Sequence, residues 1–198
     1  MKKGILIALA VVVGLAVIIG LAFSGTYNNL VSSDEAVKSA WAQVENVYQR
    51  RLDLIPNLVE TVKGYATHES ETLQNVVNAR ASISKVNITS DVVNNPEMLK
   101  KFQESQGQLS SALSRLLVVS ENYPDLKANQ NFLDLQSQLE GTENRIAVER
   151  KRFNEVAQVF NTLRRTFPSM IVAGWMGLKE KAYFEADKGA EKAPQVKF

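Results

Sequence analysis

The stretch GILIALAVVVGLAVIIGLAF, residues 4–23, decides the architecture of this chain. It follows Met1-Lys2-Lys3 and contains no charged residue. As an uninterrupted helix, a segment of this length at about 1.5 Å per residue spans about 30 Å, the thickness of the hydrocarbon core of a bilayer. The sequence therefore predicts that residues 1–23 are a transmembrane anchor embedded in lipid.

A cleaved secretory signal is the alternative reading of this segment. Signal peptides also begin with basic residues, but they usually have an apolar core of about 7–15 residues and an A-x-A-like cleavage site. The apolar run here is longer, and the best exit, Ala22-Phe23-Ser24, is poor. Lys2 and Lys3 precede the span, and no base follows it before Lys38. We expect a retained single-pass anchor in the inner membrane, with a cytoplasmic N-terminus and an extracytoplasmic bundle.

The composition of the remaining chain excludes several classes of protein. Without Lys2 and Lys3, the 23 Lys and Arg residues fall to 21, against 21 Asp and Glu, and no basic block occurs. Nucleic acid is therefore not an expected partner. The chain has no cysteine and therefore forms no disulfide. It has only five prolines and ten glycines, and this small number favours long secondary-structure elements.

Apolar residues recur with a spacing of three and four in three long runs, which indicates helices that pack through coiled-coil-like seams. The runs lie within residues 37–76, 99–123 and 132–167. The longest contains Phe132, Leu135, Leu139, Thr142, Ile146, Glu149, Phe153, Val156, Phe160, Leu163 and Phe167. We predict an all-α fold, with the transmembrane helix followed by an elongated antiparallel bundle of three to four long helices. The bundle would span residues 24–186, and residues 187–198 would be a disordered tail.

Local signals suggest where these helices begin and end. Ser32 and Glu35 form a capping box, which predicts that the first bundle helix begins near Asp34. Pro56 lies in a stripe that keeps its phase, so we expect a kink and not an end. Residues 87–96 read as a loop, and Pro124 and Pro168 should close the second and third helices.

Residues 169–184 mix apolar and charged side chains. The segment could lie on a membrane surface as an amphipathic helix, or fold back onto the bundle. We favour the second, because Lys179 and Lys181 are balanced by Glu180 and Glu185. Trp175 and Phe184 are expected to be exposed contact residues.

Five spaced motifs resemble the successive signatures of the LemA family. They are Tyr27-Asn28-Asn29-Leu30-Val31, Arg51-x-Asp53-Leu54-Ile55-Pro56-Asn57-Leu58-Val59, Tyr65-x-x-x-Glu69, Glu121-x-Tyr123-Pro124-x-Leu126-Lys127 and Glu143-Asn144-Arg145-Ile146-Ala147. Arg150-x-x-x-Asn154 and Phe167-Pro168 add to the set. The resemblance implies a single-pass membrane protein with a helical bundle and no established catalytic residue. It also implies relatives in magnetosome membranes and a neighbouring membrane metallopeptidase or other membrane protein as a possible partner.

Polar residues within or beside the seams are the candidate interaction or polar-network residues. They are Arg51, Asn57, Glu143, Arg145, Glu149, Arg150 and Asn154. The last five of these residues belong to the third long helix, and their spacing brings them onto neighbouring faces of that helix. Our main interpretation is that they pair with one another and fix helix register. For Asn57 we expect its amide to satisfy the carbonyl freed by Pro56.

The inventory of reactive groups argues against an enzyme. His68 is the single histidine, so no catalytic site, metal site or cofactor site is expected. The favoured function is a scaffold or adaptor that assembles with copies of itself or with membrane proteins. The alternative is an extracytoplasmic small-ligand sensor near Arg51, Asn57, Arg145 and Arg150. Unpaired guanidinium groups around an apolar cleft would favour the ligand-binding alternative, and matched carboxylates would weaken it.

Overall fold

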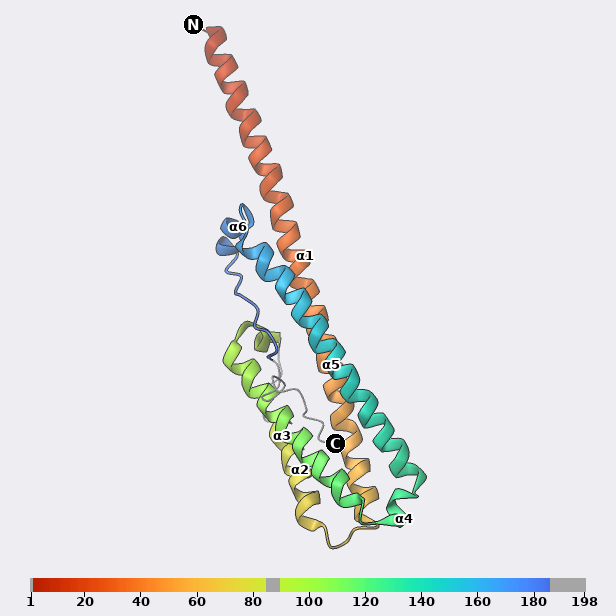
Figure 1. Ribbon diagram of the computed structural model, residues 1–198. Helices are drawn as coiled ribbons and strands as arrows, with labels where there is room; N and C mark the ends of the chain where they lie inside the picture. Colours follow the sequence, from red (N-terminus) through yellow and green to blue (C-terminus); the bar gives the residue numbers. More distant parts are fainter. Residues whose placement is uncertain (1, 85–89, 186–198) are drawn as a thin grey trace, which may run out of the picture.

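A computed structural model describes residues 2–84 and 90–185, and within these ranges it is helical with no strand. The elements are α1 (Lys2–Lys63), α2 (Ser70–Ser84), the 3₁₀ helix η1 (Ser90–Asn94), α3 (Pro96–Ser120), α4 (Pro124–Lys127), α5 (Gln130–Arg165) and α6 (Ser169–Trp175). In Figure 1, α1 projects far beyond the other helices at its N-terminal end, and α5 returns beside it. The prediction of an anchor-like helix followed by an elongated antiparallel bundle is confirmed.

Helix α1 runs for 62 residues without interruption. The prediction that a bundle helix begins near Asp34 is wrong, because Ser32 and Glu35 lie in the middle of α1. A capping box helps only where backbone N–H groups lack partners, and residues 24–33 are already helical here. Leu30 is fully buried in this stretch, so tertiary packing begins before the predicted start.

The first predicted seam is divided between two helices. α1 ends at Lys63, a short turn follows, and α2 begins at Ser70, so the chain reverses within the run 37–76. α2 then packs on α1, and α3 packs on α2. Apolar residues on both sides of the turn face one core, so both halves of the run are buried together.

Side-chain caps fix the starts of α3 and α5. The Asn95 side chain accepts hydrogen bonds from the backbone N–H groups of Glu97 and Met98, and the Asn129 side chain accepts one from Phe132. Proline occupies the first position of α3 and of α4, where a missing N–H costs nothing. In the predicted loop 87–96, η1 and Asn95 fall within the described residues, and Val92 and Val93 of η1 are buried in the core.

The core is divided along the length of the bundle. The proximal core, nearer the projecting end of α1, includes Trp41, Phe102, Phe153 and Phe184. The distal core, toward α4, includes Leu58, Leu109, Leu116 and Leu139. Nearly every residue of the predicted seams is buried or half-buried in these cores, but Phe167 is highly exposed because α5 ends at Arg165.

The segment after α5 folds back onto the bundle, as expected. Val172 and Ala173 of α6 pack against Leu30 of α1. Gly177, with a φ of 67°, then turns the chain into an extended segment, residues 178–185, which we call the strap. The predicted disordered tail, 187–198, lies outside the described residues.

Pro56 lies inside α1, which continues past it, so the prediction that it does not end the helix is confirmed. Proline has no N–H, and the carbonyl of Leu52, four residues earlier, loses its helical partner. The Nε atom of Arg80 on α2 donates to that carbonyl at 3.1 Å. The predicted partner was wrong: Asn57 is exposed, and a cation from the neighbouring helix serves instead.

We predict that Arg80→Met destabilises the full-length protein in mild detergent by about 1–3 kcal/mol, because it leaves the Leu52 carbonyl without a donor. In a Pro56→Ala background the helix recovers its own N–H, so the same substitution should cost much less. Thermal unfolding of the four proteins, followed by circular dichroism, measures the coupling. An equal cost of Arg80→Met in both backgrounds would show that the carbonyl contact is not the cause.

Candidate functional site

A layer of polar residues separates the two cores at the middle of the bundle. It consists of Arg51 on α1, Gln106 and Ser110 on α3, and Thr142 and Glu143 on α5. Tyr48 and Ile146 belong to the proximal core on one side of this layer, and Leu52 and Leu109 belong to the distal core on the other. The layer therefore lies where three long helices meet around an otherwise apolar interior.

Arg51 is the centre of the polar layer and is only 1% exposed. Its Nε atom lies 3.0 Å from Glu143 Oε1 as an ion pair, and its Nη2 atom donates to Ser110 Oγ at 2.6 Å. Burial lowers the pKa of the guanidinium from its usual value, and the Glu143 carboxylate acts in the opposite direction. Arginine nevertheless stays charged at neutral pH, so the layer is held by a buried cation bound from two neighbouring helices.

An open cleft of about 1080 Å³ reaches the polar layer, and Arg51, Gln106, Ser110, Glu143 and Arg150 are among its lining residues. Gln106 is 4% exposed, and within residues 2–84 and 90–185 neither its amide nitrogen nor its amide oxygen has a hydrogen-bond partner. The two arginines, by contrast, are engaged: Arg51 with Glu143, and Arg150 with the carbonyl of Glu185. This matched arrangement does not favour the small-ligand alternative at the predicted arginines.

Three side-chain amides bind the strap in the same way. Asn161 accepts from the N–H of Lys181 at 2.8 Å and donates to its carbonyl at 2.9 Å. Asn154 makes the same pair of bonds with Phe184, both at 2.9 Å, and Gln103 makes it with Glu185 at 3.3 and 3.1 Å. Each amide thus replaces the partner strand that an extended segment normally needs.

The spacing of the two asparagines matches the strap. Asn154 and Asn161 are seven residues apart on α5, about 10.5 Å along a helix. Lys181 and Phe184 are three residues apart in an extended chain, which covers about 10 Å. The strap therefore runs antiparallel to α5 with matched repeats.

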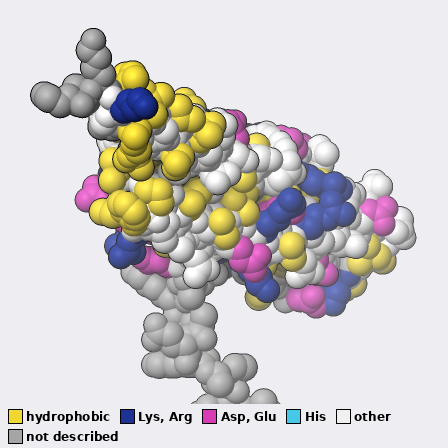
Figure 2. Space-filling view, turned by 90° about the horizontal axis from the view of Figure 1, so that it is seen from above, with side chains coloured by type: hydrophobic (Ala, Val, Ile, Leu, Met, Phe, Trp, Pro, Cys, Tyr) yellow, Lys and Arg dark blue, Asp and Glu magenta, His cyan; other side chains and the backbone are white. Residues whose placement is uncertain are grey.

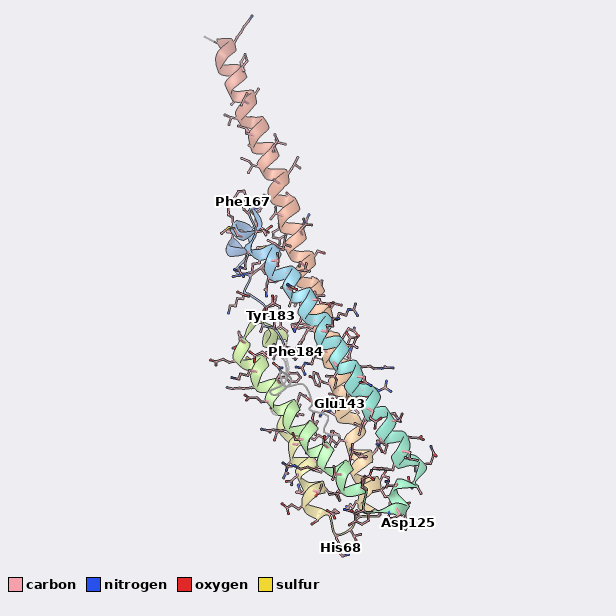
Figure 3. The ribbon with its side chains drawn as sticks, viewed as in Figure 1. His68, Asp125, Glu143, Phe167, Tyr183 and Phe184 are labelled. Carbon is pink, nitrogen blue, oxygen red and sulfur yellow. The ribbon has the colours of Figure 1, made fainter. Side chains whose placement is uncertain are left out.

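Phe184 is a strap residue whose side chain packs in the proximal core. It is buried, and its ring stacks on Trp41 and meets Phe153 edge to face. The guanidinium of Arg150 lies over the ring of Phe184, 5.1 Å from its centroid. Figure 3 shows Phe184 between the α3 and α5 sides of the bundle. The expectation that Phe184 is an exposed contact residue is wrong, because the strap turns it inward.

A buried lysine fixes the other end of the strap. The Nζ atom of Lys181 lies 2.6 Å from Asp34 Oδ1 and donates to Asn94 Oδ1 at 2.9 Å. Burial raises the pKa of Asp34, but contact with the ammonium groups of Lys181 and Lys38 outweighs it and holds the pKa below its usual value of 3.8. The strap is therefore joined to α1 by an ion pair and to η1 by a hydrogen bond.

The predicted residues have different positions in the structure. Arg51 and Glu143 pair, while Arg150 and Asn154 hold the strap. Glu149 is half-buried, and its Oε2 atom lies 3.9 Å from Arg152 Nη1. Arg145 and Asn57 are exposed, and neither lines the cleft. The sequence thus identified residues that take part in two separate contacts, but it did not identify their partners in the strap or the pairing of Arg51 with Glu143.

Two motifs that lie far apart in the sequence meet at the distal end. Tyr123 donates to Glu69 at 3.1 Å, and Asn129 donates to Tyr65 at 2.8 Å. These bonds join the α1–α2 turn to the connections around α4. His68 lies at the same end, labelled in Figure 3, and is exposed. Among residues 2–84 and 90–185, no group of three His, Cys, Asp or Glu side chains is placed to hold a metal ion.

Comparison with known proteins agrees with this architecture. A profile described as LemA family matches residues 40–198. The chain belongs to the LemA family. It is 26% identical to Protein LemA of Metamycoplasma hominis, over 84% of this chain and 72% of that protein.

Magnetosome proteins are also similar to this LemA-family chain. Magnetosome protein MamQ 2 of Paramagnetospirillum magneticum is 26% identical, and Magnetosome protein MamQ of Magnetospirillum gryphiswaldense is 24% identical. Both alignments cover 86% of this chain and 68% of the relative.

Several important residues were not predicted, among them Asn161, Gln103, Lys181, Arg80 and Gln106. Asn161 could have been found, because it repeats Asn154 after seven residues beside an apolar seam. Gln106 could also have been found, because it is a polar residue within the apolar run 99–123. The partners of Lys181 and Arg80 are distant in sequence, and no local pattern identifies them.

We predict that Asn154→Leu or Asn161→Leu loosens the strap, because each leaves a backbone N–H and C=O unpaired at a cost of about 1–3 kcal/mol. Hydrogen exchange of the peptide spanning 178–185 should accelerate by about tenfold for each 1.4 kcal/mol lost. Asn144→Leu, at an exposed position on the same helix, is the matched control. Unchanged exchange in both strap variants would refute the role of the amides.

A second prediction concerns acid. Because the pKa of Asp34 is lowered in the folded state, its contribution to stability is present above the usual value of 3.8 and is lost as the pH falls through the folded pKa. Asp34→Asn should therefore lower the melting temperature at pH 7. It should also reduce the further decrease in melting temperature on acidification. The control is Glu35→Gln, at an exposed neighbour. A variant that loses as much stability in acid as the parent would rule out Asp34 as the titrating group.

Proposed function

We propose that this LemA-family protein is a non-enzymatic scaffold or adaptor, anchored by a single span in the inner membrane, with its N-terminus in the cytoplasm and its bundle outside. The observation that carries this proposal is the continuity of α1, which runs as one helix from the apolar segment to Lys63. A bundle built on that helix is held rigidly to the segment that enters the bilayer.

The anchoring part is supported by the surface of the projecting helix. An 18-residue window of it has a mean Kyte–Doolittle hydropathy of 2.4, and none of that window is buried inside the structure. Similarity to proteins named as magnetosome proteins also supports a membrane location. The orientation rests on Lys2 and Lys3 before the span.

The length of α1 beyond the span suits a spacer or platform. If residues 4–23 fill the hydrocarbon core, residues 24–63 extend about 60 Å from the membrane at about 1.5 Å per residue. α5 packs along this extension, so the rod is at least two helices thick. Partners could thus be held at a set distance from the lipid.

The polar residues support a structural role over catalysis. Arg51 is paired with Glu143, Lys181 with Asp34, and three amides are occupied by the strap. Such contacts specify register and position, which is what a structural role requires.

The outward face of α5 is the surface we propose for assembly. Arg145, Val148, Arg152 and Val159 follow one another at spacings of three, four and seven, so they lie along one side of the helix. Val148 and Val159 are largely exposed there. This face is available to a second copy or to another membrane protein, and the family resemblance suggests a membrane metallopeptidase among the latter.

We predict that Val148→Glu combined with Val159→Glu weakens self-assembly of the full-length protein. Each valine buried in an interface contributes about 1.5–3 kcal/mol, so the concentration at half-assembly should rise by at least about tenfold. Native mass measurements of protein extracted gently from its membrane test this. Val118→Glu, on the exposed side of α3, is the control. A parent protein that stays monomeric at every concentration would exclude self-assembly and leave the adaptor role.

A further inference from the structure

Helix α6 presents an apolar face to solvent at the end of the bundle where α1 projects. Ile171 is 62% exposed and Trp175 is 74% exposed, and Met170 shares their side of the helix. Phe167, just before α6, is 79% exposed and lies four residues from Ile171. The opposite side, with Val172 and Ala173, is buried against Leu30. The exposed face is thus fixed in position by a packed one.

This face is level with the end of the apolar segment of α1. The rings of Trp175 and Phe23 meet edge to face, with centroids 6.0 Å apart. Phe23 is the last residue of the apolar run 4–23, and Tyr27 follows one turn later and is also exposed. Aromatic residues, above all Trp and Tyr, gather at the boundary between hydrocarbon and headgroups. Trp175 therefore lies at the depth where such a boundary is expected.

The chemistry around the face also fits a lipid surface. Figure 2, which looks down on this end, shows hydrophobic side chains gathered around the projecting helix. Arg164 and Arg165 line a hollow of about 330 Å³ together with Met170, Ala173 and Gly174. Cations bordering an apolar patch are typical of elements that sit among anionic headgroups.

We propose that Phe167 and the exposed face of α6, comprising Met170, Ile171 and Trp175, insert into the lipid–water interface beside the anchor. The lipid is favoured over a second protein because the patch is continuous, through Phe23, with the apolar surface of the anchor. The inference rests on the proposed anchoring by residues 4–23 and not on the scaffold role. It gives the bundle a second attachment to the membrane, which fixes its tilt and rotation about α1.

Single-cysteine labelling tests this directly, because the chain has no cysteine of its own. Full-length Ile171→Cys, Leu15→Cys and Val118→Cys, each carrying a nitroxide, are reconstituted into vesicles of phosphatidylcholine and phosphatidylglycerol. Accessibility to oxygen, which concentrates in lipid, is compared with accessibility to a water-soluble nickel chelate. Val118 is a suitable aqueous control, since it is 70% exposed and lies on α3.

The expected result is an oxygen-to-nickel ratio at position 171 that is several-fold above the ratio at 118 and approaches the ratio at 15. A ratio at 171 equal to that at 118, with position 15 in lipid, overturns the inference and leaves the anchor intact. A label at 15 that behaves like the one at 118 defeats the anchor and the inference together. Protection of 171 from both reagents would show that a protein covers the face, which also overturns the inference.

A second measurement uses the native side chains and avoids the substitution at 171. Brominated lipids should quench the fluorescence of Trp175, whereas Trp41 is buried in the proximal core. Trp175→Tyr should then abolish most of the quenching. Quenching that is absent in the parent protein, or unchanged in this variant, contradicts the lipid contact.

Discussion

The backbone of α1 is the constraint on which the rest of the structure depends. Its hydrogen bonds run without a break from the apolar segment to Lys63, and the one donor missing at Pro56 is replaced by Arg80. α5 and α2 both pack on this helix, and α3 reaches it through the ring of Phe102, which contacts Trp41, and through the polar layer. Because the helix is shared by the projecting segment and the core, the fold itself fixes the position of the bundle relative to the apolar segment.

Two kinds of polar contact then set the arrangement of the helices. The polar layer holds α1, α3 and α5 in register through one buried guanidinium, whose removal from Glu143 would leave a costly isolated charge. The strap closes the proximal core by a different device, in which amides satisfy the backbone of an extended chain and Phe184 fills the interior. Both devices are structural, which agrees with the proposal of a scaffold or adaptor.

The sequence predicted most of the helical architecture, because seam periodicity and proline positions are local signals. The three runs of apolar residues correspond to α1 with α2, α3 and α5, and the family resemblance is correct. Three of the failures share one cause: they depend on partners distant in sequence. The capping box at Ser32 was overridden by packing at Leu30, Phe184 was carried inward by the strap, and the Leu52 carbonyl found its donor on α2.

The central claim is that α1 is one rigid helix from the membrane into the bundle, and a distance across the junction tests it most directly. Nitroxides at Val17→Cys and Gln49→Cys, both exposed positions, lie on either side of residues 24–33 in the cysteine-free chain. An unbroken helix places these backbone positions about 48 Å apart, at about 1.5 Å per residue. Pulsed dipolar spectroscopy of the full-length protein in lipid nanodiscs should give one narrow distribution near that value. A broad or markedly shorter distribution would mean that the helix bends at a hinge, and the account of a rigidly anchored bundle would be wrong.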